Sequence, residues 1–185
     1  DIQLFKLKIF LDMEFVNKND FKQINSKISK ILNFCGENNV MIHSDITHLI
    51  LFKFLNKTKY LKSHIDNIHN IFSDYNIWMP SYNYNYCENR EYDIKNDSVS
   101  IGVLNDYYRK IAKWRTVTPV FSVSGNGYYP IKKYLNGETI NPFALGSEFD
   151  YLYKTNSVYC HYGSNIGHTT LIHYIEGICD NMPSR

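Results

Sequence analysis

The residues best suited to chemistry lie near the C-terminal end, where a hydroxyl, an imidazole and a carboxylate follow one another at helical spacing. A loop rich in small residues (163–167) precedes Thr169, His173 and Glu176. At about 100° per residue, a helix that begins at the threonines would place these three groups within a stripe about 60° wide. Such a stripe could supply a base, a group that orients it and a hydrogen-bond donor. The alternative is that His173 is a half-buried packing residue, which is the commoner role of a histidine in an amphipathic helix.

The composition narrows the class of protein. The chain has 185 residues, of which 44% are hydrophobic, so it suits one domain with a substantial core. Its formal net charge is only +2 and no basic run stands out, which argues against a nucleic-acid partner. No apolar run approaches the roughly 20 residues that span a bilayer, so we expect no membrane span. The four cysteines are widely spaced, and reduced thiols in a cytoplasmic protein account for them most simply.

Apolar periodicity predicts strands and helices that alternate along the chain. Strands are expected at 39–44, 77–79, 119–124 and 157–161, and helices at 20–35, 61–72, 100–112 and 147–154. Residues 3–11 could form a strand or an irregular arm. This alternation argues for an α/β sandwich of helices around a central mixed β-sheet, built as a single domain over residues 1–185.

The seven histidines invite a test for a metal site. Six of them form pairs separated by five residues: His43 and His48, His64 and His69, and His168 and His173. On a helix that spacing leaves the two side chains about 140° apart, so they cannot share an ion. No cysteine or histidine stands at the spacing of a zinc site either, and we expect no metal.

The segment 81–86 alternates tyrosine with asparagine. If it is extended, Tyr82, Tyr84 and Tyr86 lie on one face and the asparagines on the other. Three tyrosines could form a stacking wall for a sugar or another ring. The alternative, which a strand of this composition favours, is a half-buried face of a sheet.

Several segments between residues 40 and 185 resemble, in order, the motifs of one enzyme family, the aminoglycoside 3-N-acetyltransferases and relatives that act on other amines. The residues that carry this resemblance are 40–45 (VMIHSD) for a strand ending in His-Ser-Ser, 79–81 (MPS) for Met-Pro-Thr, 102–123 for a Gly-x-Leu…Arg…Arg-Ser-x-His-Pro-x-x-Ser-Val region, 142–150 (PFALGSEFD) for a Gly-x-Gly-Ser-Pro-Phe-Asp turn and 170–176 (TLIHYIE) for Thr-x-x-His-x-x-Glu. Arg185 stands where the family has an arginine shortly after the last motif.

The resemblance implies an acyltransferase that moves an acetyl group from acetyl-CoA, as co-substrate, to a primary amine. His173 would be the general base, because the pKa of an unperturbed histidine, about 6.5, suits removal of a proton from an ammonium group. Glu176 would orient His173 or hold the incoming ammonium. Thr170 would donate a hydrogen bond to the thioester oxygen or a proton to the leaving thiolate. Ideal helical geometry favours Thr169 for that role, whereas the family motif favours Thr170.

The same resemblance implies that coenzyme A contacts Ser44 and, more weakly, Ser81. For Ser44 the alternative is an N-cap of the segment that follows. Two arginines, Arg109 and Arg115, could touch phosphate or could form surface ion pairs of little energetic value. Family members continue beyond the His-x-x-Glu helix, so the resemblance also implies that this domain is incomplete at its C-terminal end, either as a fragment or as a lineage without the last strands.

The acceptor is expected to be a small-molecule amine: a drug aminoglycoside, which would link the protein to antibiotic resistance, or an amino sugar of polysaccharide biosynthesis. Four acidic residues near the tyrosine segment could form a rim for a polycation or could be a solvated loop: Glu88, Glu91, Asp93 and Asp97. A catalytically inactive relative that binds carbohydrate or another partner is the alternative function. The oligomeric state does not follow from the sequence.

Overall fold

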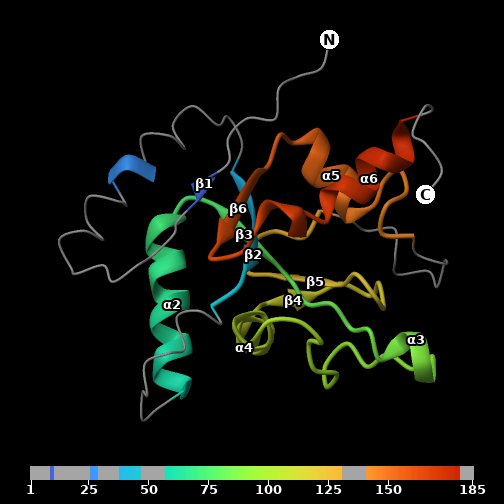
Figure 1. Cartoon of the computed structure of the whole chain (residues 1–185), viewed down its shortest axis with the longest axis horizontal. Helices are drawn as coiled ribbons and strands as arrows, with labels where there is room; N and C mark the ends of the chain where they lie inside the picture. Colours follow the sequence, from blue (N-terminus) through green and yellow to red (C-terminus); the bar gives the residue numbers. More distant parts are fainter. Residues whose placement is uncertain (1–8, 11–25, 29–37, 47–56, 131–140, 180–185) are drawn as a thin grey trace.

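A mixed sheet of six strands lies between two layers of helices in the computed structural model (Figure 1). The structure describes residues 9–10, 26–28, 38–46, 57–130 and 141–179. Across the sheet the strands are β1 (Ile9–Phe10), β6 (Val158–Tyr162), β2 (Asn39–Ser44), β3 (Asn76–Pro80), β5 (Val123–Gly125) and β4 (Trp114–Arg115). The first four strands run parallel to one another, whereas β5 runs antiparallel to β3 and β4 antiparallel to β5. The predicted α/β sandwich around a mixed sheet is confirmed.

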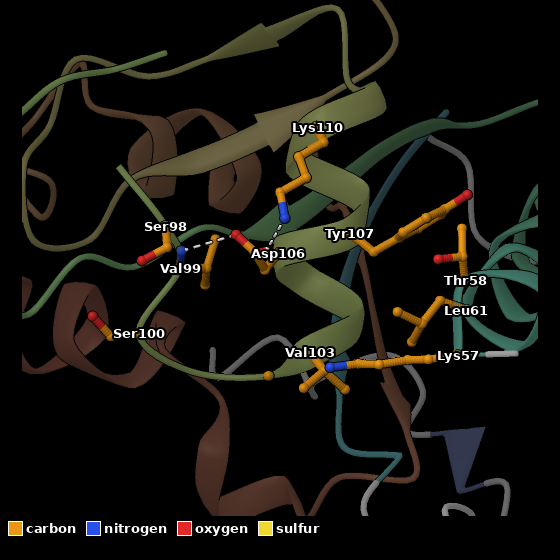
Figure 2. Close-up of a pocket in the computed structure, with 11 residues that line it drawn as sticks. Lys57, Thr58, Leu61, Ser98, Val99, Ser100, Val103, Asp106, Tyr107 and Lys110 are labelled. Atoms are coloured by element: carbon orange, nitrogen blue, oxygen red, sulfur yellow. Dashed lines mark hydrogen bonds and ion pairs between the residues drawn. The ribbon is translucent and has the colours of Figure 1, made fainter. Parts of the chain in front are cut away.

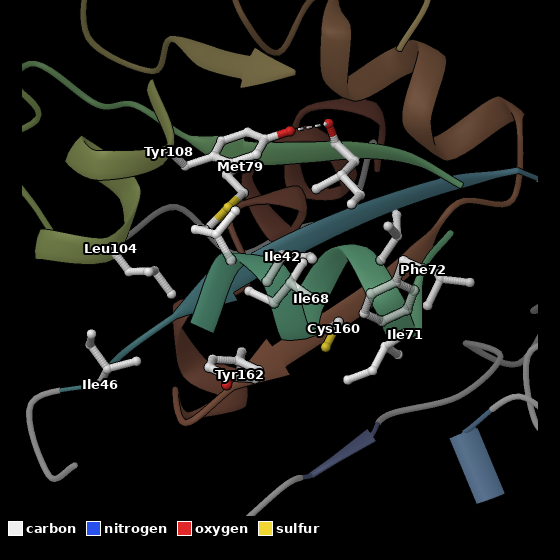
Figure 3. Packing of buried hydrophobic residues seen from close by; sticks show 14 of the residues in the cluster. Ile42, Ile46, Ile68, Ile71, Phe72, Met79, Leu104, Tyr108, Cys160 and Tyr162 are labelled. Carbon is white, nitrogen blue, oxygen red and sulfur yellow. Dashed lines mark hydrogen bonds between the residues drawn. The ribbon is translucent and has the colours of Figure 1, made fainter. Parts of the chain in front are cut away.

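One face of the sheet is covered by α2 (Lys57–Ile71) and α4 (Val103–Ile111). Apolar residues recur along α2 at three- and four-residue steps, which places Leu61, Ile65 and Ile68 on one side of the helix. Figure 3 shows Ile68 close to Ile42 of β2, in a cluster that also contains Met79, Leu104 and Cys160. Burial of each large apolar side chain stabilises the fold by about 1.5–3 kcal/mol, so this cluster fixes the two helices to the sheet.

The other face is covered by α5 (Glu148–Lys154) and α6 (Leu171–Ile178), which Figure 1 places on the side of the sheet away from α2. Successive side chains of a strand point to opposite faces, so Met41 lies on this side while Val40 and Ile42 face α2. Met41 and Trp78 form this second core with Phe149, Leu171 and Tyr174. The helix that carries His173 therefore packs directly on the sheet.

Most of the predicted elements are present. Strands over 39–44 and around 77–79 and 157–161, and helices within 61–72, 100–112 and 147–154, are confirmed. The strand predicted at 119–124 begins only at Val123, and the short strand β4 was not predicted. Of the helix predicted at 20–35, residues 26–28 are helical, and of the segment 3–11, residues 9–10 form a strand; the remainder of both lies outside the described residues.

The tyrosine segment is not a strand, so the expectation of one aromatic face is wrong. After Pro80 the chain turns, and α3 (Tyr86–Asn89) follows at once. The side chain of Asn83 causes the turn, since its oxygen accepts a hydrogen bond from the Asn85 N–H (3.1 Å). Tyr82 is buried beside the second core, whereas Tyr84 lies at the surface with 37% exposure.

Within the described ranges, no helix combines the length and the apolar character needed to cross a membrane.

Candidate active site

The loop between β6 and α6 leads the chain from the sheet to the helix that carries His173. The strand ends at Tyr162, and Gly163 then turns with a φ of +73°. A Cβ at this position would lie 2.2 Å from the backbone oxygen of Asp45, so only glycine fits the turn. The short helix η3 (Ile166–His168) follows and delivers the chain to α6.

A buried carboxylate, Asp150, fixes α6 to α5. The Tyr174 hydroxyl donates to Asp150 Oδ1 (2.5 Å), and the Gly146 N–H and the Lys154 ammonium donate to Oδ2 (2.7 and 2.8 Å). Burial opposes ionisation of Asp150, but the hydrogen bonds from Lys154 and Tyr174 outweigh it and hold its pKa below the ordinary value. Burial and the bond to Asp150 raise the pKa of Tyr174 to about 12. The contact is thus a phenol that donates to a carboxylate, one of the stronger kinds of hydrogen bond.

His173, the predicted base, lies at the surface of α6 with 46% of its side chain exposed. Its Nδ1 lies 3.4 Å from Oε2 of Glu176, one turn later on the helix. The rings of Phe121 and Phe143 stand beside the imidazole, with centroids 6.2 and 5.4 Å away. No described residue bonds to Nε2 of His173. The imidazole therefore has a carboxylate on one nitrogen, aromatic walls beside it and a second nitrogen open to a ligand.

The structure separates the two candidate threonines. Thr169 ends η3 in an extended conformation (φ −69°, ψ 99°), so the helical stripe expected to include it is wrong. Its Oγ1 lies 2.7 Å from the carbonyl oxygen of Ile166 and 2.9 Å from Nε2 of His161. Thr170 is the N-cap of α6, is 7% exposed, and accepts a hydrogen bond from the Tyr82 hydroxyl (2.5 Å).

The hydrogen bonds made by the two threonine hydroxyls favour Thr170 as the one that can donate to a ligand. A threonine hydroxyl carries one proton, and the proton of Thr169 has two nearby acceptors, the Ile166 carbonyl and the His161 ring. The oxygen of Thr170 already accepts from Tyr82, and no acceptor for its own proton is found in the described part of the chain. Thr170 therefore keeps a proton that it can donate to a ligand.

A stacked pair of buried histidines lies at the carboxyl ends of β2 and β6. His43 and His161 are register partners, with ring centroids 5.4 Å apart. Ser164 fixes the pair, because its hydroxyl donates to the His43 carbonyl (2.8 Å) and lies 3.1 Å from His161 Nδ1. Burial, followed by the charges of His161 and His168, lowers the pKa of His43 to about 3. His43 is therefore neutral at physiological pH.

Ser44 and His173 lie on opposite faces of the sheet. Ser44 donates to Asn105 Oδ1 of α4 (2.7 Å), and its register partner Tyr162 belongs to the core under α2. The preceding pair, His43 and His161, points to the face of α6 because side chains alternate along a strand. Ser44 and His173 thus lie on the two faces of the sheet, and the carboxyl ends of the parallel strands lie between these faces. This is the edge at which open α/β sheets bind ligands.

Ser81, the second predicted cofactor contact, is fully buried. It has 0% exposure, and its hydroxyl accepts a hydrogen bond from Ser124 (3.0 Å). Its carbonyl accepts from Arg115 Nη2 (2.7 Å) and from the Ser122 hydroxyl. These bonds give Ser81 a structural role, and a direct contact with a co-substrate would require this part of the core to open.

The two arginines hold a loop in place. Arg115 Nη1 donates to the carbonyl of Asp97 (2.7 Å), and Arg109 Nη1 donates to the carbonyl of Lys95 (2.8 Å). Arg109 also lies 3.4 Å from the carboxylate of Asp106, with only 8% of its own side chain exposed. Both arginines therefore support the loop 93–98, which neither alternative predicted; Arg109 also forms the ion pair that one alternative expected, but its own side chain is largely buried.

Two of the four acidic residues near the tyrosine segment serve that loop. Asp97 Oδ2 accepts from the side chain of Asn83 (2.7 Å), and Asp93 Oδ1 accepts from the backbone N–H groups two and three residues later. Glu88 and Glu91 are exposed. The cluster is therefore partly a loop scaffold and not a continuous acidic rim.

A pocket of about 380 Å³ lies on the α2 and α4 side of the sheet (Figure 2). Two lysines, Lys57 and Lys110, stand at its margin, and Asp106 is paired with Lys110 (2.6 Å). The remaining lining residues are Thr58, Leu61, Ser98, Val99, Ser100, Gly102, Val103 and Tyr107. The pocket is on the face of Ser44, opposite His173.

No group of three histidine, cysteine or acidic side chains suited to a metal ion occurs in the described ranges. His64 bonds through Nδ1 to the hydroxyl of Tyr162 (2.7 Å), and His69 packs edge-on against Tyr108. His48 lies outside the described residues.

This fold resembles that of AAC-IIIb, a protein solved in a binary complex with CoASH. The two structures align with a TM-score of 0.62 at 14% identity, over 90% of this chain and 66% of the AAC-IIIb chain. YokD from Bacillus subtilis aligns with a TM-score of 0.63 at 15% identity, over 85% of this chain and 71% of that chain. No family model and no curated protein matches the sequence. This chain therefore shares its fold with AAC-IIIb and YokD.

Three residues that organise the site were not predicted as such: Tyr82, Asp150 and His161. Asp150 stands in a segment that resembles a family turn, but its bond to α6 depends on a contact between two helices. His161 stands at the carboxyl end of a parallel strand, which is the one local signal that could have drawn attention to it. The contact of Tyr82 with Thr170 joins residues 88 positions apart and has no signal in either segment.

Proposed function

We propose that the protein is an acetyl-CoA-dependent N-acetyltransferase that acts on a primary amine of an amino sugar or an aminoglycoside. The observation that carries the proposal is the arrangement at α6. His173 lies beside Glu176, its Nε2 has no hydrogen-bond partner among the described residues, and Thr170, close in sequence, has a hydroxyl proton with no described acceptor. The likeness of the fold to a protein solved with CoASH supports acetyl-CoA as the co-substrate.

The reaction assigns one task to each group. His173 Nε2 takes a proton from the ammonium group of the acceptor, while Glu176 receives the Nδ1–H and stabilises the resulting imidazolium. The free amine nitrogen attacks the thioester carbonyl carbon, and the carbonyl oxygen becomes an oxyanion. Thr170 donates its proton in a hydrogen bond to that oxygen. Collapse of the intermediate re-forms the carbonyl and breaks the C–S bond. The attacking nitrogen, positively charged after attack, gives up its extra proton to become the amide, and the leaving thiolate takes up that proton as CoASH. His173 returns the first proton to solvent.

The two faces of the sheet would bind different parts of the co-substrate. The pocket beside α4 is lined by Lys57, by Lys110, which pairs with Asp106, and by two serine hydroxyls; these cations and hydroxyls suit the phosphates of coenzyme A (Figure 2). Ser44, the last residue of β2, bonds to Asn105 of α4, the helix that also lines this pocket. A long ligand that starts at the lysines and crosses this edge would bring its thioester to the side of His173.

The surroundings of His173 favour a single amino sugar over a long polycation. Phe121 and Phe143 provide aromatic faces on which a sugar ring can pack. Of the four acidic residues near the tyrosine segment, Asp93 and Asp97 are engaged inside their own loop. An aminoglycoside carries several ammonium groups and would need more free carboxylates than these.

The test is an assay of thiol release from acetyl-CoA with a panel of amines that contains aminoglycosides, nucleotide-linked amino sugars and simple amines. The proposal expects release that depends on the amine, together with an acetylated product identified by mass spectrometry. A Lys57→Ala, Lys110→Ala double variant should raise the KM for acetyl-CoA with little change in kcat. If calorimetry detects no binding of acetyl-CoA and no amine supports release, the protein is a non-catalytic relative and the proposal fails.

A further inference from the structure

The contact between Tyr82 and Thr170 links the turn after β3 to the start of α6. The Tyr82 hydroxyl donates to Thr170 Oγ1 at 2.5 Å, and the two side chains are 6% and 7% exposed. The ring of Tyr82 packs edge-on against Phe121, with centroids 5.3 Å apart, and Phe121 stands next to His173. Tyr82 therefore contacts two residues of the candidate site, Thr170 and Phe121, while its own side chain is buried.

The direction of this bond determines what Thr170 can do. Burial raises the pKa of Tyr82, so the phenol stays protonated and remains a donor at any pH at which the protein works. The oxygen of Thr170 is then occupied as an acceptor, and its proton is directed elsewhere. A hydroxyl that accepts a hydrogen bond becomes a better donor, because successive bonds in a chain polarise one another.

We propose that Tyr82 is a positioning residue that holds the Thr170 hydroxyl as the donor to the thioester oxygen. The inference rests on the proposed function, since it concerns the transition state of acetyl transfer. No atom of Tyr82 is transferred: the Tyr82 proton stays on the phenol, the Thr170 proton stays on the threonine, and both bonds shorten as the carbonyl oxygen gains charge. Thr169 has no equivalent, because its own proton has acceptors within the loop.

The experiment compares Tyr82→Phe with Thr170→Val and with the double variant in the thiol-release assay. Tyr82→Phe keeps the ring against Phe121 and removes only the hydroxyl. We expect a fall of about 3- to 10-fold in kcat with an unchanged KM for acetyl-CoA. Thr170→Val should reduce kcat by about 10²- to 10³-fold, the usual effect of one lost oxyanion donor. Adding Tyr82→Phe to Thr170→Val should have no further effect.

Tyr108→Phe is the matched control. It removes a buried tyrosine hydroxyl that donates to the Ile77 carbonyl (3.2 Å) on the opposite face of the sheet. Its activity should equal that of the unmodified protein. Thr170→Ser is a second variant that retains the hydroxyl but not the methyl group that restricts χ1. With Tyr82 present it should be nearly fully active, and Tyr82→Phe should impair it more than it impairs the threonine enzyme.

The outcomes separate the inference from the proposed function. If Thr170→Val is impaired but Tyr82→Phe is not, the positioning role is refuted while the function stands. An equal loss on Tyr82→Phe in the Thr170→Val background also refutes it, because Tyr82 then acts independently of Thr170. If no amine is acetylated by the unmodified protein, the proposed function fails and the inference fails with it.

Discussion

Acidification from pH 7 to pH 5 should weaken the fold, and His43 should account for a defined part of the loss. His43 is 4% exposed, stacks against Tyr159 and His161, and its Nε2 has no hydrogen-bond partner among the described residues. Protonation would place a charge in this setting without a partner, next to His161 and His168. Burial and these neighbours lower the pKa of His43 to about 3 from an ordinary 6.5.

The sign and size follow from the two pKa values. Between pH 6.5 and 3 the unfolded chain binds a proton at His43 that the folded chain does not bind, so the free energy of unfolding falls as the pH falls. The full difference corresponds to about 5 kcal/mol, of which about 2 kcal/mol is lost by pH 5. Burial lowers the pKa of His64 and of His69 as well, so they add to the loss in the same interval.

The assay is urea unfolding at pH 7 and pH 5 of the unmodified protein and of His43→Phe, which keeps a ring in the stack. His64 and His69 are present in both proteins, so their contributions cancel in the comparison. The unmodified protein should lose about 2 kcal/mol more than the variant on going to pH 5. Losses that agree within about 0.5 kcal/mol would refute the reasoning, because the effects of independent changes usually add to within that margin.

Three further predictions concern the loop and α6. Thr170→Val should abolish most of the acetyl transfer, with a fall in kcat of about 10²-fold or more. Thr169→Val should keep kcat within about 10-fold of the unmodified protein and chiefly reduce thermal stability. The reverse order of the two effects on kcat would assign the donor role to Thr169. Asp150→Asn removes the charge that Tyr174 and two further donors share, so urea unfolding at pH 7 should show a loss of about 1.5–3 kcal/mol, and an unchanged midpoint would contradict the anchoring of α6. Gly163→Ala combines a φ of +73° with a contact to backbone, so the melting temperature should fall by the equivalent of about 1–3 kcal/mol, and a variant as stable as the unmodified protein would contradict the turn.

The elements with a regular apolar period were predictable from the sequence. Leu61, Ile65 and Ile68 recur at helical steps, and α2 buries all three together with Ile71. The strand over 39–44 is buried along its whole length, and its centre (40–42) is a short apolar run, as expected of a central parallel strand.

Where local hydrogen bonds compete with periodicity, the prediction failed. The tyrosine and asparagine alternation has the period of a strand, but Asn83 bonds to the backbone two residues on and closes a turn. Thr169 has the right spacing for the helical stripe, but its hydroxyl lies within reach of the Ile166 carbonyl, and the residue ends a 3-10 turn. Helical spacing says nothing about where the first turn begins.

The site was predictable only in part. His173 and Glu176 lie one turn apart on the same helix, so local spacing was enough to pair them. The support for that helix comes from Asp150, Tyr82 and His161, which lie on other elements. Their contacts depend on how α5, the turn after β3, and β6 meet in space, and no period within one segment encodes that.

The most direct measurement of the central claim is thiol release from acetyl-CoA, with the best amine of the panel, by the unmodified protein, His173→Ala and the control His168→Ala. His168 is an exposed histidine of the same loop, so it matches the chemical change without touching the proposed base. His173→Ala should lose about 10²- to 10⁴-fold in kcat, the usual contribution of a general base, while His168→Ala keeps its rate. Undiminished turnover by His173→Ala would contradict the assignment of His173 as the base.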